Sequence, residues 1–391
     1  KHLQDNNLLT DKQHGFVKGK STTTAITSLI QNVIDLLEDG KIVTGLLLDF
    51  SKAFDSLGHD LILSKLDALG IKGSAKSWFQ SYLTGRSQVV EIKYTANNMV
   101  QFVKSSPKEI TRGVPQGSVL GPILFILFTN DMPQQLGDLS TCLMFADDTT
   151  LIISGDTTAN LKERSAQSLH KAYKYCKDND LVANTTKTKQ ICFWRSNAET
   201  VGLENIVLED KVKLLGMTID RKLTWTPHVD NLCKTLSSGL YAMRRLKQVA
   251  DINTARTAYF GLCEPHIRYG LIVWGGTSHG NMERVLILQK RAIRILADLQ
   301  PLETCRNSFK DLKIKTVVNL YIQEAIMYAD KHEPLRNDKI HNYNTRHASF
   351  FVTPQHRLTL YERQPLYIGC KLHNHLPDNI RGLKGQDLRR E

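Results

Sequence analysis

Apolar positions recur along the chain with two different periods. Ile26, Leu29, Ile30, Val33 and Leu37 fall on one face of a helix that Ser21 or Thr22 can cap and Gly40 can end, near Asp39. Residues 43–50 form a nearly continuous apolar run that closes on an acid and an aromatic ring. Such a run is typical of a strand that is buried on both faces.

The remaining pattern predicts helices over residues 60–69, 74–83, 117–132, 158–179, 226–249, 255–262 and 282–296. It predicts strands over 88–94, 143–145, 149–153, 190–194 and 212–215. Beyond about residue 301 the pattern weakens. We therefore expect a mixed α/β unit followed by a helical, basic unit, with the boundary near residues 200–225.

Composition narrows the class of protein. The 391 residues are 41% apolar, as in a globular chain. The net charge of +12 favours a polyanionic partner. Solubility alone is the other explanation of this positive charge. The seven cysteines form no C-x-x-C pair, and neither a signal peptide nor an apolar run of about 20 residues is present. We expect an intracellular protein, in nucleus or cytoplasm, that is not secreted. The first residue is Lys1 rather than Met, so we expect a fragment.

Two acidic positions carry the candidate chemistry. Asp49 ends the buried run, and Asp147 with Asp148 lies between two strand-like segments that predict a hairpin. An acid at the end of a buried strand is costly without a partner, and a divalent cation with hard oxygen ligands is a natural one. Taken alone, an Asp-Asp pair is more often an ordinary turn, and Asp49 a helix cap.

The order of the surrounding motifs decides between these interpretations. The chain carries LDFSKAFD at 48–55, RGVPQGSVLGPILF at 112–125, FADD at 145–148, Asn184 with Lys187 and Thr188, and LG at 215–216 with LTW at 223–225. QHGF at 13–16 precedes them. This series resembles the palm motifs of reverse transcriptases from non-LTR (LINE-type) retrotransposons, of the jockey and CR1 kinds. The resemblance covers about residues 13–300.

The resemblance implies a right-hand polymerase with an antiparallel α/β palm and packed helices. Its domains would be partial fingers at 1–40, a palm at 41–200, a thumb-like region at 201–300 and a basic C-terminal region at 301–391. A fingers segment would precede Gln13. The implied reaction is RNA-directed DNA synthesis with Mg²⁺ (or Mn²⁺), in which dNTPs are added to a DNA primer on an RNA template.

By the same resemblance, the catalytic and metal-binding residues are Asp49, Asp147 and Asp148, of which Asp148 is the less certain ligand. Nucleotide contacts are implied for Phe50, Phe54, Gln116, Gly117 and Lys187, and a primer grip for Leu215 and Gly216. Lys187 near the leaving pyrophosphate can serve as a general acid, or it is an ordinary surface lysine.

Phe54 bears on the choice of sugar. In the family a ring at this position leaves no room for a 2′-hydroxyl, whereas viral RNA polymerases place an acid there and have Gly-Asp-Asp as their third motif. Here the residue is Phe54, with Asp55 one position later, and the third motif is Ala-Asp-Asp, so DNA synthesis is favoured. The alternative for a lone Phe is a core position. A non-catalytic nucleic-acid-binding relic of a retroelement remains the alternative function.

Three further patterns carry weaker signals. The segment 15–21 has three residues between its glycines where a P-loop has four, so we reject an NTPase. Lys18 and Lys20 in this segment then either lie on a solvated face or contact phosphate. Cys370, His373 and His375 lack a recognised zinc spacing. Arg244, Arg245 and Lys247, with Tyr241, fit a thumb helix that grips a duplex, or simply a solvated face.

Overall fold

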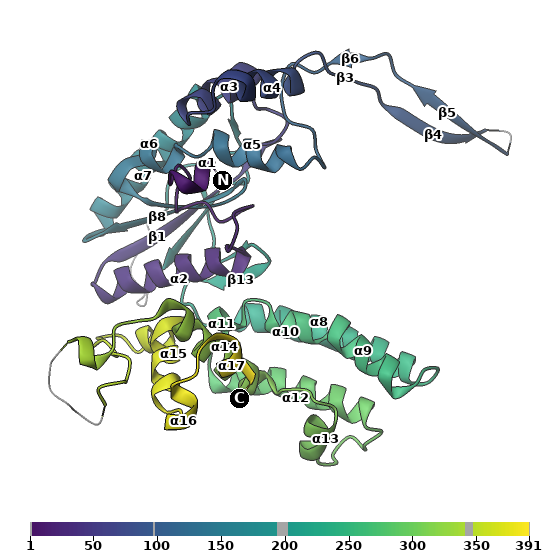
Figure 1. The fold of residues 1–391 in the computed structure, drawn as a ribbon, viewed down its shortest axis with the longest axis vertical. Helices are drawn as coiled ribbons and strands as arrows, with labels where there is room; N and C mark the ends of the chain where they lie inside the picture. Colours follow the sequence, from purple (N-terminus) through teal and green to yellow (C-terminus); the bar gives the residue numbers. More distant parts are fainter. Residues whose placement is uncertain (1, 97, 194–201, 341–346, 391) are drawn as a thin grey trace. The chain divides into compact units, whose positions relative to one another are not determined.

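The computed structural model describes residues 2–96, 98–193, 202–340 and 347–390. The chain forms two compact units, drawn in Figure 1, and each is described by itself. The first comprises Lys1–Ala25, Thr44–Gln190 and Glu199–Leu208, and the second comprises Ile26–Val43, Ile191–Ala198 and Glu209–Glu391. Three elements run from one unit into the other along the chain: α2 (Thr22–Glu38), β1 (Ile42–Leu48) and β10 (Lys189–Phe193).

The other elements of the first unit follow in chain order: α1 (His2–Asp5), β2 (Phe50–Ser51), α3 (His59–Ala68), α4 (Gly73–Leu83), β3 (Ser87–Gln88), β4 (Glu91–Ala96), β5 (Met99–Lys104), β6 (Lys108–Glu109), α5 (Leu120–Phe128), α6 (Met132–Leu136), the 3₁₀ turn η1 (Gly137–Leu139), β7 (Thr141–Phe145), β8 (Asp148–Gly155), α7 (Thr158–Asp178), β9 (Val182–Ala183) and β11 (Val207–Leu208).

A five-stranded sheet forms the centre of this unit, in the order β11-β10-β1-β8-β7. β1 is the middle strand, and its residues from Val43 to Leu46 are buried, as its apolar run predicts. β7 and β8 pair antiparallel, whereas β11 joins β10 in a parallel pairing that the expected antiparallel sheet did not include. α7 packs against β8 and α6 against β7. The predicted strand 190–194 is present as β10, but Trp194 lies outside the described residues.

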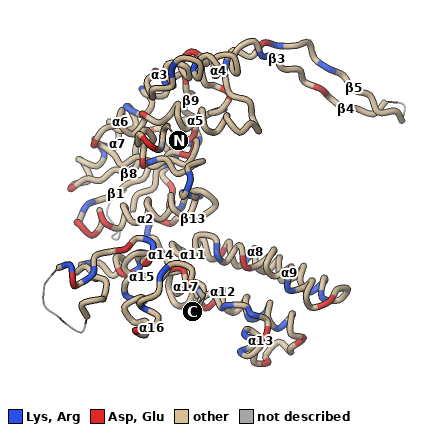
Figure 2. Tube along the Cα trace, viewed as in Figure 1, with Lys and Arg blue, Asp and Glu red and all other residues tan. Residues whose placement is uncertain are grey.

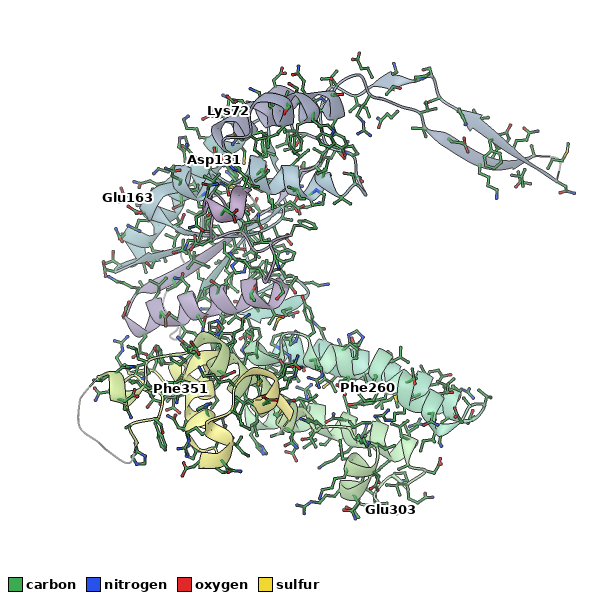
Figure 3. All side chains as sticks on the ribbon, viewed as in Figure 1. Lys72, Asp131, Glu163, Phe260, Glu303 and Phe351 are labelled. Carbon is green, nitrogen blue, oxygen red and sulfur yellow. The ribbon has the colours of Figure 1, made fainter. Side chains whose placement is uncertain are left out.

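The helix predicted over residues 117–132 was wrong in its extent. It begins only at Leu120, ends at Phe128, and is followed by the separate short helix α6. Polar side chains of the break are used in tertiary hydrogen bonds: the Asn130 amide nitrogen donates to Leu8 O at 2.8 Å, and Lys65 Nζ donates to the Asp131 carboxylate at 2.7 Å. The Asp131 side chain, labelled in Figure 3, also accepts the Tyr175 hydroxyl at 2.7 Å.

A long two-stranded ribbon was only half predicted. The alternation over 88–94 corresponds to β3 and β4, and β4 pairs with β5 in the register Ile92↔Val103 and Tyr94↔Gln101. Figure 1 shows the ribbon running out from the end of α4, with every strand residue from Glu91 to Thr95 exposed. β5 was not predicted; all six of its residues are exposed, and the strand is defined by its pairing with β4.

The other elements of the second unit are β12 (Lys211–Leu214), β13 (Met217–Asp220), α8 (Thr226–Lys247), α9 (Ile252–Leu262), α10 (Glu264–Arg268), α11 (Leu271–Trp274), α12 (His279–Leu296), α13 (Arg306–Asp311), α14 (Val317–His332), the 3₁₀ turns η2 (Asn337–Lys339) and η3 (Tyr361–Arg363), α15 (Pro365–Asn374), α16 (Asp378–Arg381) and α17 (Gly385–Arg390). The predicted helices 226–249, 255–262 and 282–296 are confirmed as α8, α9 and α12, with ends shifted by a few residues.

The region after residue 301 is ordered by packing that the sequence pattern did not predict. α14 packs on α15 and α17, and Ala329, Phe351 and Cys370 form a buried cluster; Phe351 is labelled in Figure 3. This region also completes the end of α2. The Arg357 guanidinium donates to the backbone oxygens of Leu37 and Glu38 at 3.1 and 2.8 Å, which satisfies carbonyls that a helix end leaves without partners.

Candidate functional site

Asp49 follows the carboxyl end of β1 and directly precedes the short strand β2. Its backbone oxygen accepts the N–H of Asn184 at 2.8 Å, and the next residue, Phe50, pairs with Ala183 of β9. Phe50 is buried, and Asp49 is partly exposed. The predicted fourth motif is therefore fastened directly to the first by backbone hydrogen bonds.

The fourth motif brings Lys187 beside Asp49. Asn184 O accepts the N–H groups of Lys187 and Thr188 at 3.3 and 3.0 Å, which forms a turn directly after β9. From this turn Lys187 Nζ lies 3.8 Å from Asp49 Oδ2. Both side chains are open to solvent, 69% and 40% exposed, so the pair contributes little to stability.

Asp147 lies in the two-residue turn that joins β7 to β8. The predicted hairpin is present, but Phe145 pairs with Asp148, so Ala146 and Asp147 form its tip and Asp148 belongs to β8 instead of the tip. Ala146 has φ 55°, in the left-handed region that a primed hairpin turn requires. The turn therefore presents Asp147 at the end of the sheet next to the neighbouring strand β1.

A segment that the sequence reasoning left without a role fixes this turn. Lys12–His14 runs along β7: Gln13 bridges to Met144 in parallel, and His14 N donates to Met144 O at 2.8 Å. The buried Gln13 side-chain oxygen accepts the N–H of Gly15 at 2.8 Å and of Ala146 at 3.0 Å. A Cβ on Gly15 would lie 2.3 Å from Ala146 N, so only glycine fits against the turn. No local pattern in the sequence marks Gln13 or Gly15 for this contact.

The three acids repel one another. Burial raises the pKa of the Asp148 carboxyl above its ordinary value, and the neighbouring charges of Asp147 and Asp49 raise it further. Asp148 is the first residue of β8, and its side chain is open to solvent on one side although its carboxyl is partly enclosed. Within the described ranges no three His, Cys, Asp or Glu side chains are drawn together tightly enough to form a ready-made metal site. The three carboxylates instead share a field that favours a cation.

Phe54 has a packed face and an open face. Its ring centre lies 4.6 Å from that of Phe125, a fully buried residue of α5, and its own side chain is half-buried. Val114 N donates to Phe54 O at 2.9 Å, which ties the loop after β2 to the second motif. The Phe54 ring is thus held in place by the core on one face, and its other face is open to solvent.

Gln116 borders a cavity of about 710 Å³ beside this loop, and Gly117 is the next residue along the chain. Gln116 Nε2 donates to both carboxylate oxygens of Asp55, at 3.0 and 3.2 Å. Gly117 has φ 77°, and no atom would contact a Cβ added to it. The sequence predicted that Gly117 would open the helix, but α5 begins three residues later, at Leu120. The cavity is lined by Lys52, Asp55, His59, Leu83, Arg86, Gln88, Glu109, Ile110, Thr111, Arg112, Gly113, Val114, Pro115 and Gln116.

Lys20 stabilises the N-terminal segment that contains Gln13. Its ammonium group donates to Gln13 O at 2.9 Å and to Asp11 O, and burial lowers its pKa. Lys20 therefore holds the loop from which Gln13 reaches the Ala146–Asp147 turn.

Leu215 and Gly216, the predicted primer grip, belong to the second unit. They form the two-residue turn between β12 and β13, with φ 45° and 80°, and the Tyr269 hydroxyl donates to Leu215 O at 2.5 Å. The LTW segment that follows is held by Asp220, whose carboxylate accepts the N–H groups of Thr224 and Trp225 at 3.1 and 2.8 Å. Arg244 and Arg245 lie in the last turn of α8, and Lys247 pairs with Asp298 at 3.0 Å.

Residues 1–219 match the family model described as reverse transcriptase (RNA-dependent DNA polymerase), and the chain belongs to this family. The sheet with its covering helices is accordingly the palm of a right-hand polymerase, and a helical unit follows it, as expected. The assignment of residues 201–300 to the thumb stays a prediction. Reverse transcriptases generally use divalent metal ions, in agreement with the field at the three carboxylates.

The relatives among known proteins come from mobile elements. The chain is 27% identical over 344 residues to the probable RNA-directed DNA polymerase from transposon BS of Drosophila melanogaster, covering 84% of this chain and 37% of that protein. It is 26% identical over 317 residues to the RNA-directed DNA polymerase from mobile element jockey of the same species, covering 77% and 33%. The chain thus spans about a third of the length of these two curated relatives. The expected kinship with jockey-like, LINE-type elements is confirmed.

Among solved structures, telomerase from Candida albicans in complex with a fragment of telomeric RNA aligns with a TM-score of 0.45 and 12% identity, over 81% of this chain and 57% of that one. Apo telomerase from Candida tropicalis aligns with a TM-score of 0.41 and 12% identity, over 80% and 56%. In the part of the chain that the structure describes, none of the helices is both long and apolar enough to cross a membrane.

Proposed function

We propose that this chain is the polymerase core of a retrotransposon reverse transcriptase, which adds deoxynucleotides to a primer 3′-hydroxyl on an RNA template and releases pyrophosphate. The observation that carries the proposal is the grouping of Asp49 with Asp147 and Asp148 on adjacent strands of the sheet, close enough for their charges to act on one another.

The donor set fits divalent cations. Three carboxylates offer the hard oxygen ligands that Mg²⁺ or Mn²⁺ prefers. Burial raises the pKa of Asp148, and the charges of Asp147 and Asp49 raise it further, a repulsion that a bound cation would relieve. Asp49 and Asp147 are the proposed principal ligands, with Asp148 supporting the field. Bound metal would supply activation of the attacking hydroxyl and neutralisation of the leaving group's charge.

The chain's own residues would orient the substrates. The open face of Phe54 would exclude a ribose 2′-hydroxyl, and the contact with Phe125 supports this role by holding the ring in place. Phe50 is the buried anchor of the same loop. Gln116 and the freely accessible backbone at Gly117 would contact the nucleotide and template, with Asp55 fixing the Gln116 amide.

Lys187 is the proposed proton donor to the departing pyrophosphate. Its ammonium group lies 3.8 Å from Asp49 Oδ2, next to the position where the phosphates would meet the acids, and it is free to move because it is exposed. Leu215 and Gly216 would support the primer end, through a turn that Tyr269 stiffens.

The test is primer extension by the purified protein on an RNA template, with dNTPs or NTPs, in Mg²⁺, in Mn²⁺ and in EDTA. We expect extension with dNTPs that needs a divalent ion. Absence of extension under every metal condition, by protein that is folded and binds the template–primer, would overturn the proposal in favour of a non-catalytic nucleic-acid binder.

A further inference from the structure

A cavity in the second unit lies between α12, α13 and the start of α14, and none of the residues that line it belongs to the polymerisation site proposed above. Its volume is about 750 Å³, within the size range of ligand-binding pockets. It is lined by Leu286, Lys290, Arg294, Thr304, Cys305, Arg306, Phe309, Lys310, Lys313, Ile314, Lys315, Thr316 and Asn319.

The lining is strongly cationic. Six of its residues are Lys or Arg (Lys290, Arg294, Arg306, Lys310, Lys313 and Lys315), and no acid is among those that line it. Figure 2 shows Lys and Arg positions recurring along α12 and α13. Such a concentration of like charge destabilises a compact unit unless a polyanion neutralises it.

These cations are not used for internal ion pairs. Among the described residues none of the six has a carboxylate within salt-bridge distance, and Arg294 Nε donates to a backbone oxygen, Glu303 O, at 2.8 Å. Some cations elsewhere in the unit are paired, such as Lys247 with Asp298 at 3.0 Å and Arg268 with Glu264 at 2.7 Å. What distinguishes the cavity is that six cations line one concave surface together with no acid.

The floor of the cavity is apolar. Cys305, Phe309 and Ile314 are buried, while Arg306, Lys310, Lys313 and Lys315 are exposed around them. Thr316 at the rim caps α14, accepting Asn319 N at 3.2 Å, so the positive end of a 16-residue helix dipole adds to the field. An apolar floor with a cationic rim suits a ligand that alternates phosphate with less polar units, as a nucleotide chain does.

We propose that this cavity binds a single nucleic-acid strand, with Lys310, Lys313 and Arg306 on successive phosphates and Phe309 beneath a sugar or base. A single strand fits better than a duplex, because only an unpaired strand can bring a sugar or base onto the apolar floor while its phosphates meet the cations. The inference rests on the proposed function only for the choice of nucleic acid as the polyanion.

The experiment measures binding of a fluorescent single-stranded RNA by anisotropy, in EDTA and without dNTPs, over a range of salt. Lys310→Gln/Lys313→Gln is compared with wild type and with Lys331→Gln/Lys339→Gln, a matched pair of exposed lysines outside the cavity and without ion pairs. Loss of two phosphate contacts should reduce the slope of log K against log salt by about 1.4 and weaken binding about tenfold at 0.1 M salt. The control pair should leave both unchanged.

Equal binding by all three proteins would overturn the inference, and so would equal weakening by both variants, which indicates diffuse charge. Inositol hexakisphosphate or inorganic phosphate is added as a competitor in a parallel series. A small anion that binds wild type but not the cavity variant, while RNA binds both alike, would also overturn it. Because no metal or dNTP is present, the result stands apart from primer extension: an inactive polymerase that still binds RNA through Lys310 and Lys313 contradicts the proposed function alone.

Discussion

The side-chain oxygen of Gln13 accepts the backbone N–H of Ala146 at 3.0 Å, in the turn that presents Asp147. The same oxygen accepts Gly15 N at 2.8 Å, so one buried amide orients both the turn and the segment lying on it. The turn residue Ala146 has φ 55°, a conformation that a non-glycine residue keeps only when its surroundings impose it. Residues 133 positions apart thus determine where the hairpin tip lies.

Gly15→Ala should therefore impair catalysis more than stability. The added Cβ would lie 2.3 Å from Ala146 N, so the turn must shift, and a misplacement of this kind costs about 100-fold in rate. We expect kcat for primer extension to fall by about that factor, with a stability loss of about 1–3 kcal/mol in denaturant unfolding. Gly280→Ala, where nothing lies within 4 Å, is the control and should be neutral. Unchanged kcat in Gly15→Ala would contradict the role of this contact.

Asp147→Asn should abolish extension while leaving the fold intact. The substitution keeps the shape of the turn but removes a charge from the group of three carboxylates. Relief of the repulsion from Asp147 should also lower the pKa of Asp148, since that neighbour helps to raise it. Extension rate and thermal unfolding are measured beside Asp138→Asn, an exposed acid elsewhere in the unit. Near-normal extension by folded Asp147→Asn would show that Asp147 is only a turn residue.

Phe54→Val should increase incorporation of ribonucleotides. A smaller side chain leaves room beside the sugar, while Phe125 and the backbone bond from Val114 keep the loop in place. The readout is the ratio of kcat/KM for dNTP and NTP, which we expect to fall about tenfold or more, the discrimination that one well-packed apolar contact provides. Leu57→Val, a fully buried change in the same loop, controls for destabilisation. An unaltered ratio would assign Phe54 to the core alone.

Lys187→Gln should slow the chemical step by about 100-fold if Lys187 donates the proton to pyrophosphate. Lys187 Nζ lies 3.8 Å from Asp49 Oδ2, and Lys187→Arg keeps a positive charge at this position. The arginine guanidinium, however, gives up its proton far less readily than the lysine ammonium group. Single-turnover rates across pH distinguish the roles: a proton donor is not rescued by arginine, whereas a purely electrostatic partner of Asp49 is. Full activity of both variants would leave Lys187 an ordinary surface residue.

Stability should fall as the pH is lowered from 6.5 towards 4. Burial lowers the pKa of His228 to about 4, and the pKa values of His14 and His373 are lowered to about 4 as well, chiefly by burial. Between that value and 6.5 the unfolded chain binds protons that the folded chain does not, so protonation favours unfolding. His228 packs against Trp274 with ring centres 5.9 Å apart, and His228→Phe keeps an aromatic ring there. Its unfolding free energy, measured in urea at pH 7, 5.5 and 4.5, should fall less steeply than that of wild type; identical slopes would contradict the assignment.

The amino-acid sequence alone determined the elements whose signals are local. The stripe from Ile26 to Leu37 specified α2, and the run ending at Asp49 specified β1, because burial of one face or two leaves a direct imprint on residue type. The acids Asp49, Asp147 and Asp148 were identified as a set by the order of their motifs, and this order also indicated the family.

Tertiary structure decided what depends on partners distant in the chain. Asn130 and Asp131 end α5 because their side chains bond to Leu8 and Lys65, and the ordered region after residue 301 completes α2 through Arg357. Gln13 and Gly15 have ordinary sequence surroundings and gain their role only where β7 passes beside them. The basic cavity likewise arises from three helices, since charges spread over residues 290–315 form a site only when the chain brings them around one floor.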